Sequence, residues 1–206
     1  MIKNILIANR GEIACRIIKT AKKLKIKTVS IYSDSDINAE HVLMSDDSYY
    51  LGPSEASNSY LNISKIIEIC KKAEVGAVHP GYGFLSENPS FVRELTKNKI
   101  IFIGPSEDAI ILMGDKIKSK MIAEKASVNV VPGFIGEINN INHAKEISKK
   151  IGFPVIVKAS AGGGGKGMRI VNSEEDVEEA FLRASSEAKN SFGDERLFVE
   201  KYLIEP

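Results

Sequence analysis

A glycine-rich segment between two strand-like runs is the part of this sequence best suited to chemistry. Residues 155–171 read VIVKASAGGGGKGMRIV, and four consecutive glycines, 162–165, precede Lys166 and Gly167. Glycines lack Cβ atoms, so such a loop can close over a polyphosphate and offer it backbone N–H groups. Lys158 and Lys166 add ammonium groups that can meet phosphate oxygens. The segment therefore predicts a flexible flap that binds a nucleotide.

Two common glycine-loop motifs do not fit this segment. Gly162, Gly164 and Gly167 match G-x-G-x-x-G, but the dinucleotide-binding motif requires a helix after the loop, and residues 168–171 predict a strand. A P-loop requires Ser or Thr after the Gly-Lys pair, where this chain has Gly167. A mobile glycine-rich hairpin without a ligand stays open as the alternative.

Two segments nearer the N-terminus are also candidates for binding. Residues 7–16, IANRGEIACR, predict a strand, a turn and a helix start, although Arg10 and Glu12 could form no more than a local ion pair. Residues 79–89, HPGYGFLSENP, follow a strand and hold several polar side chains. Loops at the carboxyl edge of a parallel sheet commonly carry binding residues. The alternative for this loop is a tight turn around a buried His79.

Lys116 stands in an unusual place for a cation. It falls in the first turn of a helix that Asp115 is predicted to cap. The helix dipole disfavours positive charge at this end, so an external anion would explain the lysine. A solvated lysine is the alternative.

Composition and charge are those of an ordinary globular protein. Of 206 residues, 43% are hydrophobic and 27% charged, and 28 basic residues nearly balance 27 acidic ones. This balance argues against a surface for nucleic acid or for a membrane. The apolar run at the N-terminus is too short for a signal peptide or a membrane span. We expect a cytoplasmic protein in which Cys15 and Cys70 are reduced core residues.

The order of predicted elements indicates an α/β protein with two parts. Up to residue 103, strand and helix patterns alternate, which predicts a doubly wound parallel sheet. The expected strands are 2–8, 28–32, 77–78 and 100–103, and the expected helices are 12–23, 63–73 and 91–97. Later elements are helices 116–125 and 143–151, strands 155–158, 168–171 and 197–202, and a helix opened by a capping box of Ser173 and Asp176.

Taken together, these segments resemble biotin carboxylase, the ATP-grasp component of acetyl-CoA, propionyl-CoA and pyruvate carboxylases. The resemblance covers essentially the whole chain, and its most specific parts are the loop around Tyr82 and the glycine flap. It implies a Rossmann-like N-terminal domain over residues 1–113, a helical connector over 114–130, and an ATP-grasp subdomain over 131–206. It also implies a ligase reaction in which ATP and bicarbonate give carboxyphosphate, which then carboxylates biotin.

The resemblance assigns roles to particular residues. Lys116 and Lys158 would contact ATP phosphates, and Gly163, Gly164 and Gly165 would cover them. Met168 would pack against adenine, while Glu200 and the backbone of Lys201 and Leu203 would meet its polar edge. Tyr82, Gly83 and Glu87 would lie near biotin and bicarbonate.

The resemblance further implies partners and cofactors beyond this chain. These are Mg²⁺, biotin on a carboxyl carrier protein or domain, a carboxyltransferase component, and a homodimer of the full-length protein. In that family the Mg²⁺-binding glutamates, the bicarbonate-binding residues and the catalytic arginine come after the matched region. We therefore expect an N-terminal piece that has no metal ligands or catalytic residues and is inactive alone.

Two other functions stay open at this point. One is a non-catalytic nucleotide-binding or interaction module of ATP-grasp descent, and the other is a different ATP-grasp ligase, such as half of a carbamoyl phosphate synthetase. The sequence also leaves open which acyl-CoA or keto acid receives the carboxyl group; with acetyl-CoA, the pathway would be fatty acid biosynthesis.

Overall fold

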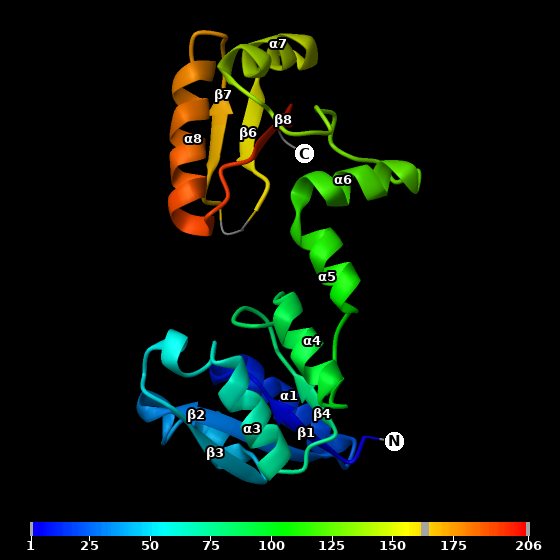
Figure 1. The fold of residues 1–206 in the computed structure, drawn as a ribbon, viewed down its shortest axis with the longest axis vertical. Helices are drawn as coiled ribbons and strands as arrows, with labels where there is room; N and C mark the ends of the chain where they lie inside the picture. Colours follow the sequence, from blue (N-terminus) through cyan, green and yellow to red (C-terminus); the bar gives the residue numbers. More distant parts are fainter. Residues whose placement is uncertain (1, 162–164, 205–206) are drawn as a thin grey trace. The chain divides into compact units, whose positions relative to one another are not determined.

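The chain folds as two compact units, residues 1–111 and 112–206. The computed structural model describes residues 2–161 and 165–204. Each unit has its own sheet, and Figure 1 shows the strands of each sheet with their helices. The α/β fold with a parallel sheet and a second, smaller sheet confirms the predicted fold class. The domain boundaries at residues 113 and 130 stay a prediction.

The first unit is built on a five-stranded parallel sheet in the order β3-β2-β1-β4-β5. Its strands are β1 (Asn4–Ile7), β2 (Lys27–Ser33), β3 (Asp47–Gly52), β4 (Ala77–His79) and β5 (Ile101–Phe102). Its helices are α1 (Gly11–Lys23), α2 (Glu40–Met44), α3 (Ile63–Lys72) and α4 (Pro89–Lys97), with short 3₁₀ turns at Asp34–Asp36 and Ala56–Asn58. Helix α5 (Glu107–Gly114) contains the division between the units.

Alternation along the strands gives this sheet two apolar faces. Leu6 of β1 belongs to the core formed with α3 and α4, whereas its neighbours Ile5 and Ile7 pack with α1. Successive side chains of a strand point to opposite faces, so one strand serves both cores. Cys70 is buried in the first of these cores as expected, while Cys15 is half-buried, and both are free thiols.

The second unit holds a three-stranded antiparallel sheet in the order β7-β6-β8. Its strands are β6 (Val155–Ala159), β7 (Met168–Val171) and β8 (Leu197–Lys201), and its helices are α6 (Lys116–Lys125), α7 (Ile141–Ile151) and α8 (Val177–Phe192). Helices α7 and α8 pack on one face of this sheet, against a core that includes Val157, Val171 and Val199. Figure 1 shows both helices beside the strands.

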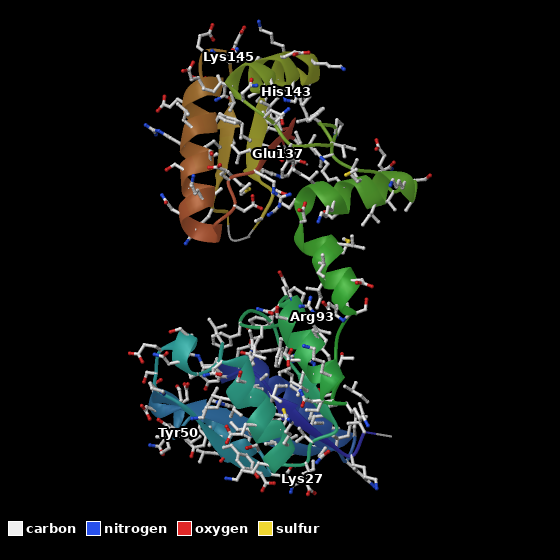
Figure 2. The ribbon with its side chains drawn as sticks, in the orientation of Figure 1. Lys27, Tyr50, Arg93, Glu137, His143 and Lys145 are labelled. Atoms are coloured by element: carbon white, nitrogen blue, oxygen red, sulfur yellow. The ribbon has the colours of Figure 1, made fainter. Side chains whose placement is uncertain are left out.

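Two helices begin at the predicted caps, and α7 begins at a cap that was not predicted, two residues before the expected start at residue 143. The side-chain oxygens of Asn88 and Asp115 accept backbone N–H groups in the first turns of α4 and α6. Asn140 does the same for α7 by accepting from the N–H of His143 at 2.9 Å. Figure 2 labels His143 and Lys145 on this helix.

The predicted capping box at α8 is wrong. The Ser173 hydroxyl donates to the Asp176 carboxylate at 3.0 Å instead of capping the backbone, and the helix begins only at Val177. The sequence pattern also missed β3, α2 and α5. Strand β3 begins at Asp47 and ends at Gly52, residue types depleted in strands, and it pairs with β2 at the edge of the sheet. Its strand signal is therefore confined to the few residues between them.

Candidate functional site

The second sheet brings three of the predicted nucleotide-binding residues onto one face. Lys158 lies directly opposite Met168 on β7. On the other side Lys158 pairs with Phe198 of β8, so Glu200, two residues further along β8, points to the same face as Lys158. This is the face opposite the core under α7 and α8. Strand alternation therefore gathers a cation, a thioether and a carboxylate on one surface.

The Glu200 carboxylate is the electrostatic centre of this face. Its side chain is only 8% exposed. Lys158 Nζ donates to Oε1, and Lys120 Nζ of α6 donates to Oε2 at 2.7 Å. Burial acts to raise the pKa of Glu200, but hydrogen bonds and charge from Lys120 and Lys158 outweigh it, and the net pKa is lowered. Glu200 is thus a carboxylate acceptor at neutral pH.

Lys120 is a member of this cluster that the sequence analysis missed. Besides Glu200, its ammonium donates to the carbonyl of Val131 at 2.9 Å and lies 5.7 Å from the centroid of the Phe198 ring. Lys120 is one of several lysines on α6. Its position one helical turn beyond Lys116 was a usable signal, because residues four apart share a helix face.

A network around Asp115 fixes the start of α6. One Asp115 oxygen accepts from the N–H groups of Ile117 and Lys118 and from the Ser160 hydroxyl, each at 3.0 Å. Arg196, just before β8, donates to the other oxygen at 3.0 Å. Burial acts to raise the pKa of Asp115, but these donors outweigh it, and the net pKa is lowered. The network ties the helix to the ends of β6 and β8.

This network places Lys116 beside the residues that directly follow β6. Its backbone N–H donates to the Ser160 carbonyl at 3.1 Å, and its Nζ lies 3.5 Å from the Ala161 carbonyl. Lys158 lies near the end of β6, and Lys116 contacts Ser160 and Ala161, which follow that strand. Cations so placed suit a polyphosphate lying along the hairpin.

The hairpin between β6 and β7 confirms the strand-loop-strand context that excluded a dinucleotide motif and a P-loop. Gly165 and Gly167 have φ values of +81° and +67°, which favour glycine. A Cβ at Gly167 would also lie 2.9 Å from the Cβ of Ala159. Gly163 and Gly164, predicted to cover phosphates, lie outside the described residues.

The end of β8 and the residues just after it carry the backbone groups predicted to meet adenine. The Lys201 backbone N–H donates to the Pro132 carbonyl at 2.7 Å, and its ammonium donates to the carbonyls of Gly152 and Phe153 at 2.9 and 3.0 Å. These bonds hold Lys201 in place as part of the scaffold. Leu203, two residues later, is exposed.

In the first unit, the loops after β1 and β4 meet where the strand order reverses. Strands β1 and β4 are neighbours although β2 and β3 intervene in sequence, and such switch points open a crevice at the carboxyl ends of strands. Buried Asn9 joins the loops, because its Nδ2 donates to the carbonyls of Pro80 and Tyr82 at 2.7 and 2.8 Å. Asn9 was not among the residues predicted from the sequence.

Tyr82 and Gly83 line a pocket of about 250 Å³ at this crevice, together with Asn9, Arg10, Glu12, Ile13 and Phe84. Tyr82 is 60% exposed, and its hydroxyl donates to Glu12. The possible Arg10–Glu12 ion pair is not formed, since Arg10 pairs with Asp36 at 3.3 Å and stacks on Tyr60 and Phe84.

The structure also shows where Glu87 and His79 of this loop lie. Glu87 is exposed and does not line the pocket of Tyr82. His79 is half-buried, its pKa is lowered by burial, and its Nδ1 accepts from the Gly81 N–H at 3.0 Å. The loop therefore contains both the tight turn around His79 and the pocket lined by Tyr82.

Among residues 2–161 and 165–204, no cluster of three or more His, Cys, Asp or Glu side chains could hold a metal ion. Over the same described ranges, no helix is long and apolar enough to cross a bilayer.

Comparison with known proteins identifies the class of protein to which this fold and site correspond. Residues 1–110 match the family model of the biotin carboxylase N-terminal domain, and residues 115–206 match that of the carbamoyl-phosphate synthase L chain ATP binding domain. The chain belongs to the biotin carboxylase family.

Particular relatives support this membership. The chain is 54% identical, over 98% of its length, to the human mitochondrial propionyl-CoA carboxylase alpha chain, but it covers 28% of that protein. Its fold matches biotin carboxylase from Campylobacter jejuni, solved as a β,γ-ATP complex, with TM-score 0.97 and 48% identity over 100% of this chain and 46% of that one. It also matches the biotin carboxylase domain of Hydrogenobacter thermophilus 2-oxoglutarate carboxylase, a dimer with MgADP, ADP and bicarbonate, with TM-score 0.93 and 45% identity over 98% of this chain and 45% of that one.

Proposed function

We propose that this chain supplies the N-terminal part of a biotin carboxylase, in which its second unit forms one wall of the ATP site. The observation that carries the proposal is the placement of Lys158, Met168 and Glu200 on one sheet face, beside a glycine hairpin. The chain spans less than half of the solved biotin carboxylases that it matches, so the complete reaction is proposed for the longer protein.

The donors and acceptors on this face fit ATP chemically. Lys116 and Lys158 would bind phosphate oxygens, and Gly163 to Gly165 would cover them. Met168 would pack against adenine, and Glu200 would accept from its amino group. The backbone of Lys201 and Leu203 would pair with the ring edge.

ATP would supply the phosphoryl group that activates bicarbonate. The contribution of this chain is to fix cations near the phosphates before reaction, which stabilises charge that develops on the transferring oxygens. Closure of the glycine hairpin would exclude water that could otherwise hydrolyse the activated carbonate.

We place biotin and bicarbonate near the crevice of the first unit. Tyr82 and Gly83 line its pocket, and Glu87 stands five residues beyond Tyr82 on the same loop. The Tyr82 hydroxyl, oriented by Glu12, offers a polar group at an exposed surface. For Mg²⁺, the described residues supply no ligand cluster, so we assign it no residue and no step in this chain.

The final acceptor, the partners and the location are proposed more broadly. Propionyl-CoA carboxylase among the relatives makes an acyl-CoA carboxylase a good candidate, and nothing singles out acetyl-CoA or fatty acid biosynthesis. We propose a biotin carboxyl carrier, a carboxyltransferase component and a homodimer for the full-length protein. The cytoplasm is proposed for a bacterial protein, whereas the human relative is named mitochondrial.

Isothermal titration of the 206-residue chain with ATP tests the proposal. ATP is expected to bind, and Lys158→Ala is expected to weaken the affinity by about tenfold or more, the usual cost of losing a charge-assisted hydrogen bond. The matched control is Lys150→Ala, which removes an exposed lysine of α7.

Binding should also persist in EDTA, because the described residues hold no metal cluster. Equal ATP affinity of the Lys158 and Lys150 variants would contradict the proposed site.

A further inference from the structure

Two ammonium groups share the buried Glu200 carboxylate, and the structure holds them very differently. Lys120 is 11% exposed at its side chain, donates to the Val131 carbonyl as well as to Glu200, and lies against the Phe198 ring. Lys158 is 25% exposed, and the hydrogen bond shown for its ammonium is to Glu200. Lys120 therefore makes three contacts, whereas Lys158 is the more exposed of the two cations and has fewer partners for its ammonium among the described residues.

We propose that Lys120 is a positioning residue of the nucleotide site: it holds the Glu200 carboxylate in place so that Lys158 can leave this carboxylate for a phosphate. This inference rests on the proposed ATP-binding function. It assigns Lys120 no contact with ATP.

The charges around the buried Glu200 carboxylate must stay balanced. A carboxylate with two ammonium partners carries a net charge of +1, so one cation can move to an anionic ligand and leave a neutral pair behind. With Lys120 absent, the departure of Lys158 would leave the buried Glu200 carboxylate without a positively charged partner, which is strongly unfavourable. Lys158 would then stay on Glu200, and phosphate binding would weaken although every phosphate-binding side chain is present.

Lys120 also determines how Glu200 is presented to a base. Its bond to Oε2 and its anchor on Val131 fix one carboxylate oxygen, and departure of Lys158 frees Oε1 as an acceptor. A carboxylate can accept from an exocyclic amino group but cannot donate to a carbonyl oxygen. The cluster would thereby favour adenine over guanine nucleotides.

The first experiment needs no nucleotide. In the ligand-free chain, a ¹³C-detected titration of the Glu200 carboxyl compares Lys120→Met, Lys158→Met and the control Lys125→Met, which changes an exposed lysine in the last turn of α6. Lys120 and Lys158 are the charged groups that face this carboxylate among the described residues. We expect Lys120→Met to raise the pKa of Glu200 more than Lys158→Met, and the control to leave it unchanged. An equal or smaller effect of Lys120→Met overturns the holding role.

The second experiment is a double-mutant cycle with ATP. Lys120→Met should weaken ATP binding by about tenfold, since ATP loses both the phosphate contact of Lys158 and part of the base contact of Glu200. Adenosine should be weakened less, because it can lose only the base contact. In a Glu200→Gln background, Lys120→Met should have little further effect, because no buried carboxylate then needs a partner. Lys120→Arg should restore most of the affinity, and the preference for ATP over GTP should fall with Lys120→Met.

The outcomes separate the two proposals. Failure of the unsubstituted chain to bind ATP would overturn the proposed function and the release of Lys158, while the carboxyl titration would still decide whether Lys120 holds Glu200. If ATP binds but Lys120→Met weakens it equally with and without the Glu200 carboxylate, the effect is general destabilisation. The inference about Lys120 then fails and the nucleotide site stands.

Discussion

Gly133 and Glu200 lie in direct backbone contact, at a bridge that extends the second sheet beyond β8. A Cβ at position 133 would come within 2.7 Å of the Glu200 Cβ and 2.8 Å of its Cα. The neighbouring residues of Gly133 pair with the same strand, since Phe134 N–H donates to Val199 and Lys201 N–H to Pro132. The segment that carries Val131, the anchor of Lys120, is thus fitted against β8 at a distance that only glycine allows.

Gly133→Ala should therefore destabilise the second unit by about 1–3 kcal/mol, the usual cost of overpacking. The added methyl group would push residue 133 away from Glu200 and disturb the site. Thermal unfolding monitored by circular dichroism measures the loss. Gly114→Ala is the control, because a Cβ there meets nothing within 4 Å, and unchanged stability of the Gly133 variant would contradict the close fit.

Asn9→Ala should loosen the crevice of the first unit. It removes the bonds to the carbonyls of Pro80 and Tyr82 from a residue that is 4% exposed, and the unpaired carbonyls should cost about 1–3 kcal/mol. Hydrogen exchange should accelerate most in the loop of residues 80–84. The variant Asn98→Ala, at the end of α4, is the comparison, and it should leave exchange in this loop unchanged.

Gly167→Ala should impair the hairpin more than Gly165→Ala. Both substitutions force alanine into positive φ, at a cost of about 1 kcal/mol each. At residue 167 the new Cβ also meets Ala159 at 2.9 Å, whereas at 165 its nearest neighbour is the end of Met168 at 3.7 Å. Calorimetry of the two variants should show the lower melting temperature for Gly167→Ala, and the reverse order would refute the steric argument.

Asp115→Asn should remove a pH-dependent part of the stability. Because the folded-state pKa of Asp115 is lowered, its charge stabilises the fold above the unfolded pKa of about 4. This contribution is lost as the pH falls through the folded pKa. Asparagine can also cap a helix, so the variant keeps the cap and removes only the negative charge of Asp115. That charge is the one to which Arg196 and the backbone N–H groups donate.

Urea unfolding of the two proteins measures this effect. The unsubstituted chain should be more stable than Asp115→Asn by about 1–3 kcal/mol at pH 7, as expected for hydrogen bonds to a charged group. The difference should shrink below pH 4. A difference that stays constant from pH 7 to pH 3 would exclude a role for the charge.

Local chemistry in the sequence determined many elements closely. Helix α6 runs from Lys116 to Lys125 after Asp115, and β7 covers Met168–Val171, both as predicted. Capping side chains and alternating apolar residues act within a few positions of one another, so their signals are present in the sequence itself. The same holds for the glycine hairpin and for the residue types at the proposed nucleotide site.

The tertiary structure decided which side chains meet across long stretches of chain. Asn9 forms hydrogen bonds with residues more than 70 positions away, and Lys120 bonds Glu200, which is 80 positions further along the chain. Gly133 matters because it pairs with Glu200 of β8, far from it in the sequence. Strand β3 likewise forms because β2 offers it an edge. Strand order and register determine which distant residues meet. Neither produces a pattern in the sequence near the residues concerned.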